Sequence, residues 1–93
     1  LKRGLSRNAK SRAELARRLN AAGLACTESA ANFLFCASPL PGRELFQRLL
    51  RRGVIVRPLD EYGLPRHVRI SVGTPAQNAF LLAALKASLA EGA

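Results

Sequence analysis

The sequence predicts a small two-layer α/β fold, in which a small mixed β-sheet has helices packed mostly on one face. Apolar residues recur at helical spacing in some segments, and short stretches between them are rich in β-branched or aromatic residues. The expected order is helix, strand, strand, helix, strand, strand, helix. The 93 residues, of which 48% are hydrophobic, can form one compact unit. We therefore expect residues 1–93 to be a single domain.

The first half of the chain predicts one helix and two strands. Residues 6–22 favour a helix, and Gly23 follows as a natural C-terminal stop. Residues 24–27 and 32–36 are then expected to be strands, with a turn between them. The second of these strands is the more apolar.

The middle of the chain predicts a second helix and a buried strand. The helix is expected to begin after Pro41 and to end at Gly53, with Arg51 and Arg52 in its last turn. There the two cations complement the negative end of the helix dipole. Residues 54–56 form a short β-branched run, which predicts a strand buried on both faces.

The last third predicts another strand and a final helix. Residues 67–72 alternate apolar and polar side chains, which places Arg69 on the face opposite its apolar neighbours. Thr74 can cap the final helix, a proline follows, and Gln77 completes a capping box. The helix is expected to run to about residue 89. Its apolar residues cover more than one stripe, which predicts contact with a surface beyond one sheet face.

The charge balance is strongly basic. Fifteen Lys and Arg against six Asp and Glu give a net charge of +9, which is typical of proteins that bind polyanions but also of solvated basic helix faces. The arginines are spread over helices and strands, and Phe33 and Phe35 stand in an apolar run that indicates core residues. A small basic nucleic-acid-binding module is therefore kept as the alternative.

Cysteine and histidine content argues against a metal site. Cys26 and Cys36 have only His67 as a possible nitrogen partner, so a zinc-type ligand set cannot be assembled. Reduced, packed thiols are expected, and a disulfide would require the two strands to run side by side. His67 is expected to face solvent.

The chain contains no apolar run approaching the ~20 residues of a membrane helix. It starts with Leu1-Lys2-Arg3-Gly4, which is neither an initiator methionine nor the start of a secretory signal. We expect a cytoplasmic chain that begins inside a longer protein.

Two arginines are the candidates for binding chemistry. Arg57 follows the run 54–56, and Arg69 lies within the next strand, across a Gly/Pro loop. A guanidinium offers a planar fork that matches a carboxylate or a phosphate, so the pair could form an anion site. Alternatively, the two arginines form ion pairs with Asp60 or Glu61.

Three motifs resemble the C-terminal small domain of histidinol-phosphate aminotransferases, which are fold-type I pyridoxal-phosphate enzymes. They are residues 53–59 (GVIVRPL), 62–65 (YGLP) and 68–74 (VRISVGT). Residues 29–33 resemble the start of a strand in that family, and residues 78–85 resemble its final helix. The likeness spans about residues 10 to 90.

The resemblance implies transamination between histidinol phosphate and 2-oxoglutarate in histidine biosynthesis. Arg69 matches the arginine that grips the substrate's anionic group, and Arg57 matches a second arginine near the same anion. Tyr62 would border the substrate entrance. Asn32 is expected mainly to cap its strand. Aromatic amino-acid aminotransferases and a threonine-phosphate decarboxylase share much of the pattern, so the substrate stays open.

The resemblance also implies which parts of the enzyme lie elsewhere. Pyridoxal 5'-phosphate is bound in the family by a large domain, which supplies the Schiff-base lysine, and the full-length protein is a homodimer. Lys2, Lys10 and Lys86 do not occupy a Schiff-base context. We therefore expect no catalytic or cofactor-binding residue in this chain, and no transamination by the chain alone. A domain separated from its large partner should also expose apolar patches.

Overall fold

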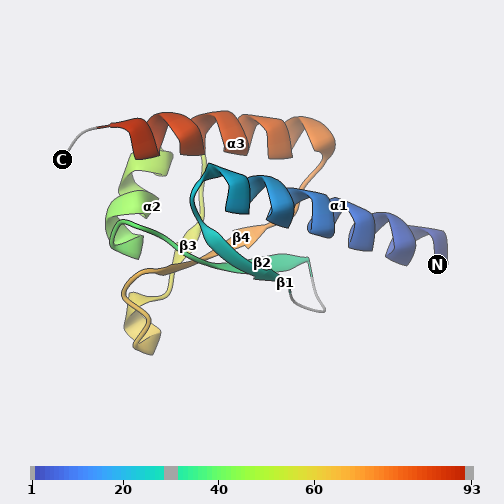
Figure 1. Ribbon diagram of the computed structural model, residues 1–93, viewed down its shortest axis with the longest axis horizontal. Helices are drawn as coiled ribbons and strands as arrows, with labels where there is room; N and C mark the ends of the chain where they lie inside the picture. Colours follow the sequence, from blue (N-terminus) through green and yellow to red (C-terminus); the bar gives the residue numbers. More distant parts are fainter. Residues whose placement is uncertain (1, 29–31, 92–93) are drawn as a thin grey trace.

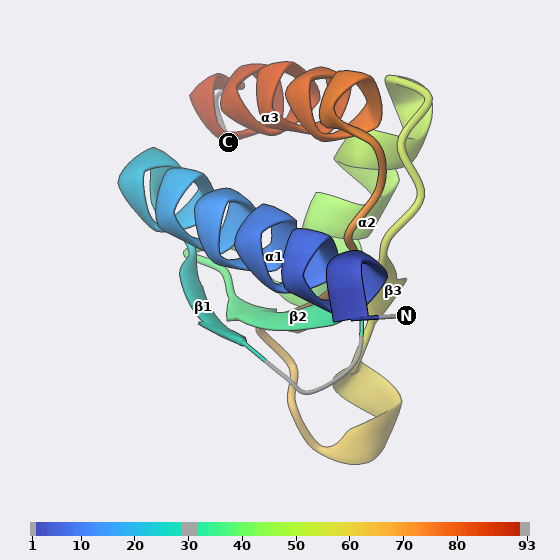
Figure 2. The same cartoon turned by 90° about the vertical axis from the view of Figure 1, so that its right-hand side faces the viewer.

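A computed structural model, shown in Figures 1 and 2, describes residues 2–28 and 32–91. The order of helices and strands predicted from the sequence is confirmed, with a short 3-10 helix in addition. The elements are α1 (Lys2–Ala22), β1 (Ala25–Glu28), β2 (Phe33–Ala37), α2 (Gly42–Arg51), β3 (Arg57–Pro58), η1 (Asp60–Tyr62), β4 (His67–Ser71) and α3 (Pro75–Ala90). The predicted turn at residues 28–31 lies largely outside the described residues.

The four strands form one sheet in the order β1-β2-β4-β3. Each neighbouring pair of strands is antiparallel, so the sheet is antiparallel throughout, where the sequence had predicted a mixed one. Short connections join β1 to β2 and β3 to β4, and such connections favour antiparallel pairs. The three helices lie on one side of the sheet, with α1 and α2 next to the strands and α3 packed across both helices (Figures 1 and 2). The described helices leave the other face of the sheet open.

The two central strands alternate between the helix-covered face and the open face. Their buried, helix-facing residues are Leu34, Cys36, Val68 and Ile70. Phe33, Phe35 and Arg69 therefore lie on the open face. Phe35 is 40% exposed and Phe33 is half-buried, so the prediction that both are core residues was wrong. Strand alternation decided the outcome, because an apolar run does not show which of its residues face the helices.

Helix α3 buries most of its wide apolar surface within the chain. Leu81, Leu82 and Leu85 are buried where α3 packs against α1 and α2. The further surface predicted from the sequence is thus supplied largely by the other two helices. Phe80 is the large apolar side chain of α3 that stays exposed, at 57%.

Residues 54–56 differ from the buried strand predicted for them. Val54 and Val56 are buried, whereas Ile55 is 78% exposed, and the strand ladder begins only at Arg57. The reason is position: this segment leads into the edge strand of a sheet that has helices on one face only, so its middle side chain points away from the core. An exposed Ile55 agrees with the expected apolar patches.

Cys26 and Cys36 lie directly opposite each other on β1 and β2, and a disulfide joins them. The prediction of reduced thiols is thereby corrected. The condition set for a disulfide is met, because the two strands pair side by side with the cysteines in register. Within the described part of the chain, no cysteine is free.

Helix α2 begins in close contact with the start of β4. The Gly42 backbone N–H donates to the Pro65 carbonyl at 2.7 Å, and a Cβ at position 42 would lie 2.6 Å from the carbonyl oxygen of His67. His67 is half-buried rather than solvent-facing, and its Nδ1 is buried without a described hydrogen-bond partner. A side chain at position 42 would push the helix away from the sheet.

We expect Gly42→Ala to lower the free energy of unfolding by about 1–3 kcal/mol, because the backbone carbonyl it meets cannot rotate away. Chemical denaturation followed by circular dichroism measures the change. Gly63→Ala is the control: Gly63 has φ +80° but nothing within 4 Å of an added Cβ. We expect Gly63→Ala to lower the free energy of unfolding by about 1–2 kcal/mol, because a side chain disfavours the left-handed backbone conformation. The idea fails if Gly42→Ala leaves the unfolding midpoint unchanged.

A carboxylate at the end of α3 lies among two arginines of α2 and the arginine that follows this helix. Glu91 accepts from Arg52 at 2.6 Å and from Arg51 at 3.0 Å, and Arg48 lies 3.7 Å away. The hydrogen bond from Arg52, with the positive charges of all three arginines, lowers the pKa of the Glu91 carboxyl below its ordinary 4.5. The predicted role of Arg51 and Arg52 at the helix end is thus extended by an ion-pair cluster.

This cluster predicts a component of acid sensitivity. Because the folded-state pKa of Glu91 is lowered, its stabilising effect is complete above the ordinary pKa and is lost as the pH falls through the folded value. Glu91→Gln should therefore reduce stability at pH 7, and the difference from wild type should shrink below about pH 4. Thermal unfolding across pH 3–7 measures this. A constant difference at every pH would contradict it.

Candidate functional site

The two arginines predicted from the sequence come together on the sheet. Arg57 of β3 and Arg69 of β4 are directly opposite in the strand register, so their side chains share the open face. Arg69 lies opposite the buried row of Val68 and Ile70, as the alternation predicted. Arg57 is exposed on the edge strand, and Arg69 is half-buried on a central strand.

Neither arginine has an acidic partner among the residues that the structure describes. The alternative ion pairs with Asp60 or Glu61 do not form, since Arg43 takes both. Its Nε and Nη2 donate to the Asp60 carboxylate at 2.8 and 3.0 Å, and Glu61 lies at 3.9 Å. The hydrogen bond from Arg43 lowers the pKa of Asp60 and keeps it ionised. Like charges directly opposite on a sheet repel, and a bound anion would relieve that repulsion.

The guanidinium of Arg69 rests on an aromatic ring. Its central carbon lies 4.3 Å from the centroid of Phe33, within the range of a cation–π contact. Phe33 pairs with Ser71, which lies two residues beyond Arg69 and is the next residue on the same face, so the arginine side chain leans along β4 towards Ser71. A ring face attracts a cation without serving as a conventional hydrogen-bond acceptor, so the contact leaves the guanidinium N–H groups available.

A cleft of about 370 Å³ adjoins the two arginines at the β3 edge of the sheet. Its lining residues are Phe46, Ile55, Val56, Arg57, Pro58, Arg69 and Ser71. Two guanidiniums and a hydroxyl offer donors to a carboxylate or a phosphate. Tyr62, the third predicted site residue, is on η1, 68% exposed and outside this lining.

Phe33 and Ser71 are the residues of this region that the sequence reasoning did not assign to the site. The signal was present for Ser71, which has the same alternation phase as Arg69. For Phe33 it required knowing that β2 pairs with β4, which no local pattern specifies. The backbone carbonyl of Asn32 accepts a hydrogen bond from the Val72 N–H at 2.9 Å. The Asn32 side chain is exposed and does not line the cleft.

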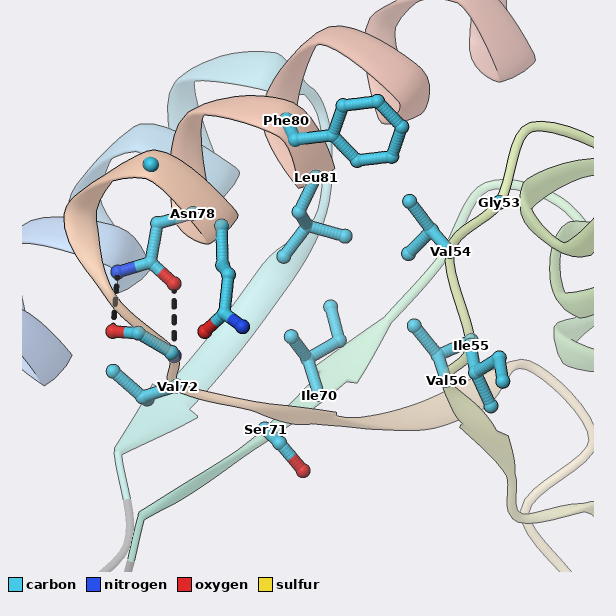
Figure 3. A pocket seen from close by; sticks show the side chains of 13 residues that line it. Gly53, Val54, Ile55, Val56, Ile70, Ser71, Val72, Asn78, Phe80 and Leu81 are labelled. Carbon is cyan, nitrogen blue, oxygen red and sulfur yellow. Dashed lines mark hydrogen bonds between the residues drawn. The ribbon is translucent and has the colours of Figure 1, made fainter.

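A larger cleft, of about 530 Å³, lies between α3, β4 and the segment before β3 (Figure 3). Phe80 and Leu81 border it from α3, and Val54 and Ile55 from the opposite side. At one end Asn78 accepts from the Gly73 N–H at 2.9 Å and donates to its carbonyl at 3.2 Å. No ionisable side chain lines this cleft, so it suits an apolar occupant rather than an anion.

The described residues do not fit pyridoxal phosphate. Lys10 and Lys86 are both exposed on helices, and the shallow groove that Lys86 borders, between α1 and α3, has no carboxylate in its lining to meet a pyridine nitrogen. Over the described ranges, His, Cys, Asp and Glu side chains form no group of three that could hold a metal ion. None of the described helices combines the length and apolar character needed to cross a membrane.

Known proteins match most of the chain. The family model "Aminotransferase class I and II" matches residues 1–85. A histidinol-phosphate aminotransferase of Symbiobacterium thermophilum is 51% identical over 70 residues, covering 75% of this chain and 19% of that protein. Histidinol-phosphate aminotransferase 1 of Nitrosococcus oceani is 41% identical over 91 residues, covering 98% of this chain and 25% of that protein.

Solved structures agree with the sequence relatives. A putative aminotransferase from Burkholderia pseudomallei matches with a TM-score of 0.77 and 32% identity, over 88% of this chain and 25% of that one. The histidinol-phosphate aminotransferase of Clostridium acetobutylicum matches with a TM-score of 0.78 and 27% identity, over 85% of this chain and 25% of that one. The chain thus spans about a fifth to a quarter of these proteins, and the predicted family resemblance is confirmed: this chain belongs to the class I and II aminotransferases.

Proposed function

We propose that this chain is the small domain of a pyridoxal-phosphate-dependent aminotransferase that acts on histidinol phosphate and 2-oxoglutarate. The observation that supports this most is the pair Arg57 and Arg69, which are opposed in the strand register, have no acidic partner among the described residues, and lie inside a family match that covers most of the chain. Relatives of 41–51% identity are named histidinol-phosphate aminotransferases. The role of this domain is to bind the anionic end of each substrate.

The charges of the pair suit that role. A phosphate monoester carries a charge of about −1.5 to −2 at pH 7, which the positive charges of two guanidiniums balance. A carboxylate carries a single negative charge, which one guanidinium balances. Holding the anion fixes the substrate amine in one direction, and such orientation contributes strongly to the rate of a bimolecular reaction. Arg69 on the central strand is the fixed anchor. Arg57 on the edge strand adds a second set of donors, and Tyr62 borders the approach from outside.

The cofactor and its lysine belong, in this proposal, to the large domain of the same longer protein, which is a cytoplasmic homodimer. The relatives are about four times as long as this chain, which leaves ample polypeptide for that domain. We propose that the large domain packs against the apolar cleft of Figure 3, where Ile55 and Phe80 are exposed at the rim.

The experiment uses the full-length protein that contains this chain. It is scanned for the visible absorbance of the bound cofactor. It is then mixed with 2-oxoglutarate and one second substrate at a time: histidinol phosphate, phenylalanine or threonine phosphate. We expect the highest kcat/KM for histidinol phosphate. Preference for phenylalanine would shift the assignment to an aromatic aminotransferase, and release of carbon dioxide from threonine phosphate would shift it to the decarboxylase. A protein that binds no cofactor would refute the proposal.

One observation favours the alternative of a nucleic-acid-binding module. Phe33 and Phe35 lie on the open sheet face with Arg69, an arrangement that could stack bases. Fluorescence anisotropy with a single-stranded RNA distinguishes the two functions. Micromolar binding that weakens steeply with salt and is lost in Phe35→Ala would support the module.

A further inference from the structure

We propose that Phe33 is a positioning residue: its ring sets the direction of the Arg69 guanidinium and keeps its N–H donors free for the substrate anion. The proposal rests on the anion-binding role assigned to Arg69 above. Phe33 belongs to β2 and reaches the site only through the pairing of β2 with β4.

The geometry sets Phe33 apart from the other phenylalanine of its strand. Phe35 is directly opposite Arg69 in the register, whereas Phe33 is opposite Ser71. The guanidinium nevertheless lies over the Phe33 ring, with its central carbon 4.3 Å from the centroid. The Arg69 side chain is therefore turned along β4 towards Ser71, and Arg69 and Ser71 both line the cleft.

An aromatic face is well suited to hold this cation. A carboxylate in the same place would orient Arg69 through the N–H groups that a substrate needs, and would neutralise its charge. The face of an aromatic ring attracts the guanidinium without accepting a conventional hydrogen bond from it, so the N–H donors stay available for an anion. It also acts on the side away from Arg57, whose charge repels Arg69 across the ladder. Phe33 thus orients Arg69 without competing with the ligand.

The test compares variants of the full-length enzyme. Phe33→Leu keeps an apolar side chain and removes the ring, Phe33→Tyr keeps the ring, and Phe35→Leu is the matched control on the same strand and face. We expect Phe33→Leu to raise KM for histidinol phosphate and the inhibition constant of inorganic phosphate by about 5- to 10-fold, with kcat within about 2-fold of wild type. Phe33→Tyr should restore both constants to within about 2-fold of wild type, and Phe35→Leu should leave them unchanged.

The outcomes separate this proposal from the one it rests on. If Arg69→Ala leaves phosphate inhibition unchanged, the anion site itself is refuted. If Arg69→Ala abolishes inhibition but Phe33→Leu behaves like Phe35→Leu, Phe33 has no positioning role. Should Phe33→Leu fail to fold, Phe33→Met takes its place and must show the same rise in both constants. A fall in kcat with unchanged constants would also overturn the proposal.

Discussion

Arg69→Ala in the full-length enzyme should lower kcat/KM for histidinol phosphate by about 30-fold or more. Removing one partner of a charge-assisted hydrogen-bonded pair commonly costs about 2–5 kcal/mol, and 1.4 kcal/mol corresponds to a factor of ten. Arg69 is half-buried on a central strand, and Arg57 is the one other cation in the lining of the cleft that the structure describes. Steady-state kinetics at several histidinol phosphate concentrations measures the loss.

Two further variants define the cause of that loss. Arg69→Lys keeps the charge but not the planar fork, so its kcat/KM should lie between those of wild type and Arg69→Ala. Arg17→Ala removes one positive charge from the exposed surface of α1 and should leave the kinetics within about 2-fold, because distant surface charges are screened. A loss below about 3-fold in Arg69→Ala would mean that the anion is held elsewhere.

Arg48→Ala should be the most destabilising single arginine substitution, lowering the free energy of unfolding by about 3–5 kcal/mol. The Arg48 side chain is only 7% exposed and joins α2 to the end of α3. Its Nη1 donates to the carbonyl oxygens of Ser88 at 2.9 Å and Glu91 at 3.0 Å, and its Nη2 pairs with Glu44. The two carbonyls are at the end of α3, where helical partners run out, so truncation removes the Arg48 donor from one buried and one partly buried acceptor.

Arg51→Ala is the matched control for this effect. Arg51 also pairs with Glu91, at 3.0 Å, but its side chain is 61% exposed. Exposed ion pairs contribute about 0–1 kcal/mol, so the control should remain near wild type in urea denaturation. Equal losses in the two variants would show that the shared charge of Glu91 matters and the buried hydrogen bonds do not.

The sequence predicted the strand that positions the candidate site, and the reason is local. Alternating side chains in residues 67–72 fix the face of Arg69, and the capping box at Thr74 and Gln77 is present with both hydrogen bonds. Helix starts and half-buried strands are set by neighbouring residues, which a single sequence displays.

Pairings between distant segments could not be predicted in the same way. That β2 lies beside β4, and so brings Phe33 under Arg69, depends on the assembled sheet. The apolar run 33–37 contains no charged residue that would mark its open face. Arg48 gives the same lesson on a helix, because its burial depends on where α3 ends, and an arginine at that position is ordinarily exposed.

The place of the two arginines in the strand order also governs how the site fluctuates. Arg69 is on a strand paired along both edges, and such strands open with the rest of the core, whereas the two-residue edge strand with Arg57 is paired on one side and can open locally. Amide hydrogens around Arg57 should consequently exchange with solvent long before those around Arg69. An anion that bridges both side chains links the faster-opening segment to the slower one, so ligand binding would register as exchange protection on β3.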